Sequence, residues 1–269
     1  MSRSLRSIAR CTILSLSVLT GIAACTVKED RSVCPCLLEV RFPDKGQIKG
    51  PVLLTGWSAE RVFEDMVDAV ECQDTYTRKV PKSTISFGAI DGISTCVYSG
   101  HSVIIPQDKE CDSLYAYIDT VDCTGERAVT EVVFHKQFAT VNLRFPGRTV
   151  TAEDYSFVVE SNSSGMDVLT CKPVEGVFRF EPEIRYDGAL RFRLPRQIDG
   201  SLSLTVRHIP SGASARFPLG YYIGYIGYDW EAEDLHDIYI TLDLVREKAD
   251  IGVAGWEEYG DYELTTVEL

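Results

Sequence analysis

Short runs of alternating apolar and polar residues occupy most of the chain downstream of residue 33. The alternation is regular in residues 114–118 (LYAYI) and 202–206 (LSLTV), as expected for strands that bury one face. Clusters of Gly, Pro, Asp and Lys separate these runs from others of the same kind and mark the turns. The pattern predicts further strands at residues 37–42, 52–57, 84–90, 95–98, 102–105, 132–145, 156–159, 177–180, 190–194, 217–226 and 237–244.

A helix is predicted in one place, at residues 59–70, and it is short. Strands that follow one another at short intervals without intervening helices form antiparallel sandwiches. We therefore expect an all-β fold. The length suits two domains of ordinary size, and we place the break between them near residues 134–137, before the strand that opens the second half. We place an N-terminal β-sandwich at residues 34–134 and a C-terminal one at residues 135–269.

The first 24 residues have the three parts of an export signal. Arg3, Arg6 and Arg10 precede an apolar run that ends at residue 22, and no acidic residue occurs before Glu29. The run is shorter than the roughly 20 apolar residues that a membrane-spanning helix requires. A basic head, a short apolar centre and an exit of small residues are typical of a cleaved secretory signal. Residues 1–24 are therefore predicted to be a signal peptide.

The exit of this segment predicts lipidation. It reads Ile22-Ala23-Ala24-Cys25, which is similar to a lipobox, so we expect cleavage between Ala24 and Cys25 and lipid on Cys25. Simple secretion with an incidental cysteine is the alternative. Each buried methylene contributes about 0.8 kcal/mol to membrane binding, and more than one acyl chain gives lasting anchoring. The lipid on Cys25 would therefore hold the mature chain on a membrane.

Residues 25–33 form a polar tether that contains a candidate surface-export signal. Lys28, Glu29 and Asp30 resemble the surface-export signal of Bacteroidetes-type lipoproteins, a lysine followed by two acidic residues shortly after the lipidated cysteine. A polar tether with incidental charges is the alternative. The motif predicts an outer-membrane lipoprotein exposed at the cell surface.

The net charge of the mature chain restricts the classes of molecule that it can bind. Cleavage removes three arginines and no acidic residue, so the formal net charge falls from −13 to about −16. A nucleic-acid-binding protein needs a cationic face that neutralises phosphates. The composition therefore argues against a nucleic-acid partner and fits a soluble body beside an anionic cell surface.

Seven cysteines remain once Cys11 has left with the signal peptide and Cys25 has taken lipid, and six of the seven lie within residues 34–123. An oxidising compartment would allow up to three disulfides. Spacing does not give the connectivity, and buried thiols that pack as small apolar groups are the alternative. No cysteine spacing matches a zinc site. The candidates for disulfide bonding are Cys34, Cys36, Cys111 and Cys123.

The sequence carries no recognisable catalytic or cofactor motif. The four histidines stand outside metal-binding spacings, and no G-x-S-x-G elbow occurs. The acidic residues of the run 229–237 lack the spacing of an EF-hand loop. No carboxylate pair stands out among the 40 acidic residues as a glycosidase site. We therefore expect a non-catalytic protein without a metal or a cofactor.

Five aromatic residues gather within residues 221–230. Exposed rings would offer sugars or a partner protein a stacking platform, for which Tyr225, Tyr228 and Trp230 are the candidates. In a strand, however, Tyr221 and Tyr225 would share one face, and such a face is usually core. Core packing is the interpretation that we favour.

Several stretches, taken in order, resemble the fimbrial anchor lipoproteins of Bacteroidetes-type bacteria, the minor-fimbrilin group. The likeness extends over nearly the full mature length. One departure occurs after the late first-domain strand, where the family often has Phe-Asp and this chain has Ile118-Asp119. The stretches are Cys34-Pro35, residues 112–118 (DSLYAYI), residues 136–143 (KQFATVNL), residues 237–244 (DIYITLDL), residues 251–253 (IGV) and Trp256.

The resemblance implies two tandem transthyretin-like Greek-key β-sandwiches after the lipidated tether. It also implies that the lipid holds the base of a fimbrium while the body contacts the shaft subunits and limits the length of the fibre. Such families assemble by adding an incoming strand to an open sheet edge, where backbone hydrogen bonds supply the affinity. Host or bacterial surface ligands are further candidate partners.

Two other functions stay open. A fimbrial shaft or tip subunit of the same fold would lose an N-terminal segment by proteolysis, at about Lys45 or Lys49. A surface glycan-binding lipoprotein would need the aromatic residues at 221–230 to face solvent.

Overall fold

The computed structural model describes residues 33–44, 48, 50–68, 70, 72, 75–147, 149–244, 248–254 and 265–267. Contacts divide the chain into Met1–Pro35 and a compact unit, Cys36–Leu269, and the elements below belong to the second. The predicted cleavage at Ala24, the lipid on Cys25 and the export signal Lys28, Glu29 and Asp30 lie outside the described residues. These three features stay predictions.

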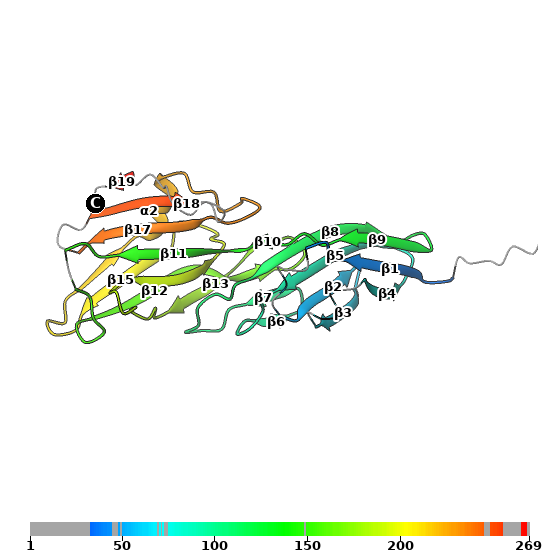
Figure 1. The fold of residues 1–269 in the computed structure, drawn as a ribbon, viewed down its shortest axis with the longest axis horizontal. Coiled ribbons are helices and arrows are strands. Elements are labelled where there is room, and N and C mark those ends of the chain that lie inside the picture. The colour runs from blue at the N-terminus through cyan, green and yellow to red at the C-terminus, as the bar shows by residue number, and fades with distance from the viewer. Residues whose placement is uncertain are drawn as a thin grey trace, which may run out of the picture. The chain divides into compact units, whose positions relative to one another are not determined.

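The first sandwich is built from two sheets in the described part of the chain (Figure 1). Leu38, Leu54 and Phe87 are buried members of one core between them. The smaller sheet has the order β4 (Tyr76–Val80), β1 (Cys36–Arg41) and β9 (Arg127–Glu131). The larger has the order β10 (His135–Lys136), β8 (Tyr115–Asp122), β5 (Thr84–Asp91), β2 (Val52–Trp57) and β3 (Arg61–Val67).

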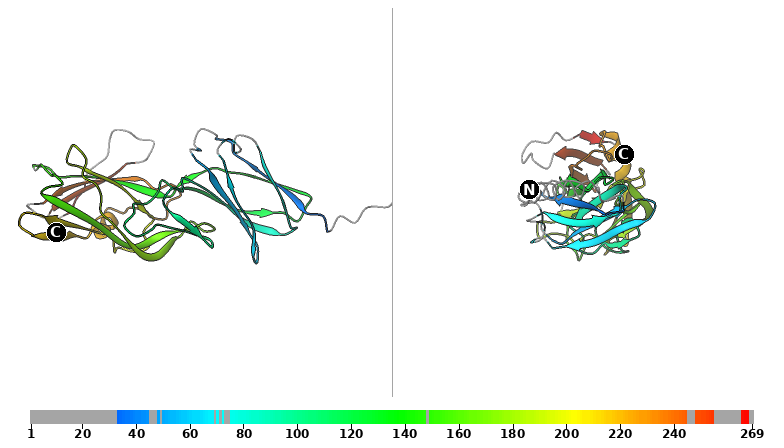
Figure 2. Two further views of the ribbon diagram at one scale, coloured as in Figure 1. Left: turned by 90° about the horizontal axis from the view of Figure 1, so that it is seen from below. Right: turned by 90° about the vertical axis from the view of Figure 1, so that its right-hand side faces the viewer.

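The second sandwich also has two sheets among the described residues, and Figure 2 shows their strands from two further directions. In β17, Ile238, Ile240 and Leu242 are buried in alternation, as a strand with one core face requires. One sheet has the order β14 (Leu190–Pro195), β11 (Phe138–Arg144), β17 (Asp237–Asp243), β18 (Lys248–Ala254) and β19 (Thr265–Val267). The other has the order β16 (Ser214–Phe217), β15 (Ser203–His208), β12 (Tyr155–Asp167), β7 (Ser102–Ile104) and β6 (Val97–Ser99), with β13 (Pro173–Phe180) paired to β12.

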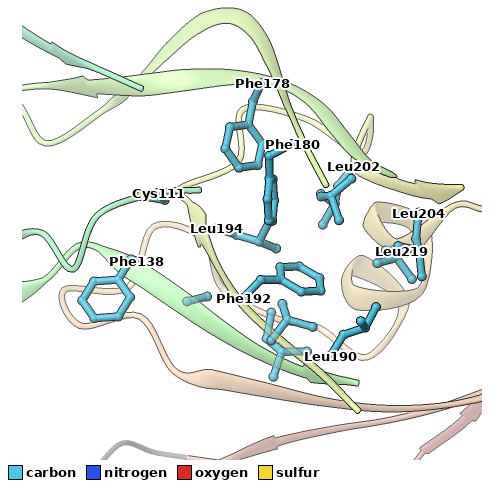
Figure 3. Packing of buried hydrophobic residues seen from close by; sticks show 14 of the residues in the cluster. Cys111, Phe138, Phe178, Phe180, Leu190, Phe192, Leu194, Leu202, Leu204 and Leu219 are labelled. Carbon is cyan, nitrogen blue, oxygen red and sulfur yellow. The ribbon is translucent and has the colours of Figure 1, made fainter. Parts of the chain in front are cut away.

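Aromatic and aliphatic side chains from both sheets fill the second core. Figure 3 shows Phe178 and Phe180 of β13 pointing toward Phe192 of β14. The rings of Phe180 and Phe192 have centroids 5.6 Å apart and meet edge to face, a favourable aromatic geometry. Leu219, from the helix that follows β16, packs into the same cluster. The prediction of an all-β sandwich fold is confirmed.

The sheets do not follow the expected boundary at residue 134 strictly. The hairpin of β6 and β7 precedes that boundary, yet β7 pairs with β12 of the second sandwich. Strand β10 follows the boundary, yet it pairs with β8 of the first sandwich. The division into residues 34–134 and 135–269 stays a prediction, and these two exchanges join the sandwiches within one compact unit.

The helix predicted at residues 59–70 is wrong, because Arg61–Val67 of this range form β3. Strand β3 pairs antiparallel with β2, and it buries Phe63 and Val67 while Met66 is exposed. Three charged residues, Arg61, Glu64 and Asp65, lie in this strand, and helix propensity is only a weak preference that pairing to a neighbouring strand overrides.

The strand predicted at residues 217–226 is also wrong beyond Phe217. Pro218 has no N–H to donate to a strand ladder, and α2 (Leu219–Tyr225) follows it. The helix buries Leu219, Tyr222 and Ile223. Tyr221 and Tyr225 are 61% and 65% exposed, so their expected core packing is wrong. Buried side chains in this segment recur with the period of a helix and not with the period of two that a strand would give.

Within the described part of the chain, every helix falls short of the length and apolarity needed to cross a bilayer. These residues also hold no cluster of three or more His, Cys, Asp or Glu side chains suited to a metal ion.

Candidate functional site

A pocket of about 700 Å³ lies where β8 and β10 meet the segments that follow β12, β14 and α2. This volume lies within the range of about 300–1,000 Å³ in which proteins bind small molecules. Its walls combine apolar side chains with hydrogen-bonding ones. The lining residues are Ala116, Tyr117, Ile118, His135, Gln137, Thr170, Cys171, Lys172, Pro173, Arg196, Gln197, Ile198, Trp230, Glu231, Ala232 and Glu233.

Arg196 is a buried cation in the wall of this pocket. Its guanidinium donates to Gln137 Oε1 at 2.8 Å, to the Trp230 carbonyl at 2.7 Å and to the Glu233 carbonyl at 3.0 Å. Burial lowers the pKa of Arg196, and the carbonyl and amide oxygens compensate for the lost hydration. The three bonds hold residues 230–233 against the start of β11, so Arg196 shapes the pocket.

Gln197 provides a buried acceptor beside Arg196. Its side chain is buried, and its Nε2 donates to the Pro195 carbonyl at 2.7 Å. Its Oε1 has no hydrogen-bond partner among the described residues. A buried acceptor without a partner costs about 1–3 kcal/mol. A ligand that brings a hydroxyl or amide donor would remove that cost.

The candidate aromatic residues separate in the structure. Trp230 is half-buried and lines the pocket. The Tyr228 ring packs against Trp230 with centroids 4.5 Å apart, and its hydroxyl donates to the His236 carbonyl at 2.7 Å. Tyr225 is exposed on α2 and is not among the lining residues. Trp230 is therefore the candidate ring that a pocket ligand would meet.

Three side-chain contacts fasten β10 to residues 233–237, at the start of β17. His135 has Nδ1 3.1 Å from Asp234 Oδ2 and Nε2 3.0 Å from Glu233 Oε1. The buried Lys136 Nζ donates to Asp237 Oδ1 at 2.5 Å. These contacts position the pocket wall at residues 230–233.

Cys171 is the thiol in the pocket wall, and its backbone has a φ of 54°. Burial raises the pKa of its thiol to about 11. The sulfur is therefore protonated at neutral pH and is a poor nucleophile. The pocket groups can bind and orient a ligand.

Beside the pocket, β8 presents an open sheet edge. Strand β5 pairs with all of β8, whereas β10 pairs only with Tyr115 and Ala116 on the opposite side. Among the described strands, none pairs with residues 117–122 on that side. The hydroxyls of Tyr117 in β8 and Thr130 in β9 share a hydrogen bond at 3.2 Å, and this bond links the two sheets. An unpaired edge of this kind can accept a strand from another chain.

The four cysteines that are candidates for disulfide bonding are thiols in this structure. Cys34 is exposed, whereas Cys36, Cys111 and Cys123 are buried. Disulfide bonding among them stays a prediction.

The pattern of the sequence did not single out Arg196, Gln197 or Gln137. The available signal was a polar pair directly after the strand of alternating apolar and charged residues that ends at Pro195. Polar residues at a strand end are common, so that signal does not distinguish a pocket from a solvated loop.

The sequence matches no family model, and no curated protein matches it significantly. Solved structures do share its fold. A Bacteroides thetaiotaomicron protein provisionally assigned to polysaccharide binding has a TM-score of 0.64 and 13% identity over 87% of this chain and 98% of that chain. A provisionally assigned adhesin from Bacteroides ovatus has a TM-score of 0.58 and 12% identity over 87% of this chain and 96% of that chain.

The fimbrial anchor protein Mfa2 from Porphyromonas gingivalis has a TM-score of 0.55 and 12% identity. That likeness covers 83% of this chain and 98% of that chain. At such identities the three likenesses establish a common all-β sandwich fold.

Proposed function

We propose that this protein is a surface-exposed outer-membrane lipoprotein that anchors or terminates a fimbrium and has no catalytic role. The observation that carries the proposal is the fold likeness to a fimbrial anchor protein, which extends over 83% of this chain and 98% of that chain. The lipobox at Ala24 and Cys25 would attach the protein to the membrane through lipid. The motif of Lys28, Glu29 and Asp30 would direct its export to the cell surface.

The open edge of β8 supports assembly with fimbrial subunits by strand addition. Residues 117–122 of β8 lack a strand partner on one side among the described residues, and Ile118 in this stretch is an exposed apolar side chain. An incoming strand would satisfy the free backbone groups and cover that side chain. The edge begins at the pocket, where Tyr117 and Ile118 also form part of the lining.

Cells that carry Cys25→Ala will release long fimbriae into the medium, because the anchor can no longer be held by its lipid. Electron microscopy will measure fibre length, and immunoblotting will measure shed fimbriae. Cys34→Ala is the matched control, since it changes a nearby cysteine and leaves the lipobox intact. Fimbriae of normal length that stay on the Cys25→Ala cells would exclude the anchor role.

Saccharide binding is a second function, and the pocket favours it. A sugar presents an apolar face that stacks on an aromatic ring and hydroxyl donors that match buried acceptors. Trp230 offers the ring, and Gln197 Oε1 offers an acceptor without a partner in the described structure. Exposed Glu231 and Glu233 add acceptors at the rim.

Trp230→Ala is expected to weaken the binding of any glycan that wild type selects from a glycan array by about tenfold or more, the effect of losing an aromatic stacking contact. Titration calorimetry will measure the affinity, and circular dichroism will verify the fold. Tyr225→Ala is the control, because that ring is exposed outside the pocket. Equal affinity in a folded Trp230→Ala variant, or no glycan bound by wild type, would exclude a saccharide site here.

A further inference from the structure

Two cysteines distant in sequence converge in the core of the first sandwich. Cys36 is the first residue of β1, and its pairing partner in β4 is Val80. Cys123 follows β8 and donates its backbone N–H to Ser83, in the turn between β4 and β5, at 3.0 Å. Both side chains are completely buried in one cluster. The turn after Val80 therefore brings both cysteines to the same end of the sandwich.

The two sulfurs are neighbours. Leu37, the residue after Cys36, donates its backbone N–H to the carbonyl of Glu126, three residues after Cys123, at 2.9 Å. Burial, with the contribution of the neighbouring Cys36 thiol, raises the pKa of Cys123 to about 12. The Cys123 thiol therefore hardly ionises at neutral pH in the folded protein, so Cys36 and Cys123 must react before the core closes around them.

A second pair lies in the core of the second sandwich. The carboxylate of Asp112 accepts the backbone N–H of Cys96 at 2.7 Å, which places that backbone beside the residue that follows Cys111. The Cys96 and Cys111 side chains are both buried in one cluster, where Figure 3 shows Cys111. The Cys96 sulfur is close enough to disfavour ionisation of Cys111, whose pKa burial already raises.

We propose that Cys36 and Cys123 form one disulfide and Cys96 and Cys111 another when the chain folds in an oxidising compartment. Adjacent backbone segments with both sulfurs in one buried cluster are the arrangement that a disulfide requires. Each pair loses two protons and two electrons as its S–S bond forms. The electrons pass to the disulfide of an oxidised thiol–disulfide carrier, which is reduced to a dithiol.

This connectivity selects Cys36 over its neighbour Cys34. The two residues flank Pro35, so sequence spacing treats them as equivalent partners for Cys123. The structure separates them, because Cys34 is exposed and Cys36 is buried with Cys123. Both disulfides require an oxidising compartment and are independent of the proposed fimbrial function.

Peptide mapping tests the connectivity directly. The mature chain is unfolded with reductant and refolded in oxidised and reduced glutathione, and its remaining thiols are alkylated under denaturing conditions before non-reducing digestion. The expected map contains peptides linked through Cys36–Cys123 and Cys96–Cys111, with Cys34, Cys72 and Cys171 alkylated. A link from Cys34 to Cys123, any exchange between the two pairs, or alkylation of all seven cysteines would overturn the proposal.

Matched variants extend the test to stability. The oxidised protein should melt about 5–10 °C above the reduced protein, because each cross-link restricts the unfolded chain. Cys34→Ser should keep both links and this difference, whereas Cys36→Ala should leave Cys123 open to alkylation and reduce the difference. Loss of the Cys123 cross-link in Cys34→Ser, or a melting temperature that oxidation does not change, would contradict the proposal. The map of the wild-type chain decides the connectivity even if a variant fails to fold.

Discussion

Replacing Lys136 by Met will lower the free energy of unfolding by about 3–5 kcal/mol, the typical cost of breaking a buried ion pair from one side. The Lys136 side chain is 5% exposed, and its Nζ lies 2.5 Å from Asp237 Oδ1. The ammonium also lies 4.9 Å from the centre of the Phe138 ring. Methionine fills similar space but leaves the Asp237 carboxylate without its cation. Urea unfolding followed by tryptophan fluorescence will measure the change.

Arg179→Met is the matched control for this prediction. Arg179 also pairs with an aspartate, Asp108, at 2.8 Å, but the two side chains are 33% and 61% exposed. Exposed pairs contribute about 0–1 kcal/mol, so we expect a small change. Similar losses in the two variants would mean that burial does not set the contribution of the Lys136–Asp237 pair.

Asp112→Asn is expected to cost about 2–4 kcal/mol at neutral pH, because three backbone donors lose a charged acceptor. One carboxylate oxygen of Asp112 accepts the N–H groups of Ser94, Thr95 and Cys96 at 2.7–2.8 Å. The other accepts the Thr95 hydroxyl at 2.9 Å. An asparagine amide would direct its own N–H groups at one set of these donors.

The pH dependence of this loss has a definite sign. Burial raises the pKa of Asp112, but the donors from Cys96, Ser94 and Thr95 outweigh burial and bring it below its ordinary value of 3.8. The ionised carboxylate therefore contributes its full stabilisation above about pH 4, and this contribution is lost as the pH falls through the lowered folded-state pKa. The difference between wild type and Asp112→Asn should be constant near neutral pH and shrink in acid.

Urea unfolding at a series of pH values will measure this difference. Asp122→Asn is the control, because the Asp122 carboxylate accepts the Thr124 N–H and hydroxyl on an exposed turn. We expect that variant to change stability little at any pH. A difference for Asp112→Asn that grows as the pH falls would contradict the assigned sign.

The strands that the pattern predicted best are those whose burial is set by one neighbouring sheet. Residues 202–206 correspond to β15, and residues 237–244 correspond to β17 with its alternating buried face. The failures lie where tertiary contacts override the local pattern. Strand β3 carries charges typical of an exposed helix but is held by pairing to β2, and α2 follows a proline that ends β16.

The candidate site likewise combines features that the sequence pattern predicted with features that tertiary contacts decided. The aromatic cluster was visible in the sequence, but the structure selects Trp230 for the pocket and leaves Tyr225 exposed on α2. Arg196 and Gln197 join Trp230 only because three separate loops meet beside β8. Nothing in the spacing of these residues along the chain predicts that meeting.

By itself the sequence determined the class of the fold and predicted the export and lipidation signals at Ala24, Cys25 and Lys28, because hydrophobic period and short recognition motifs are local properties of the chain. Only the tertiary structure decided that Cys36 lies with Cys123, that β6 and β7 join the second sandwich, and that β8 keeps an open edge beside the pocket. These features depend on pairings between residues far apart in sequence. Such pairings are set by the packing of whole sheets, which no local pattern encodes.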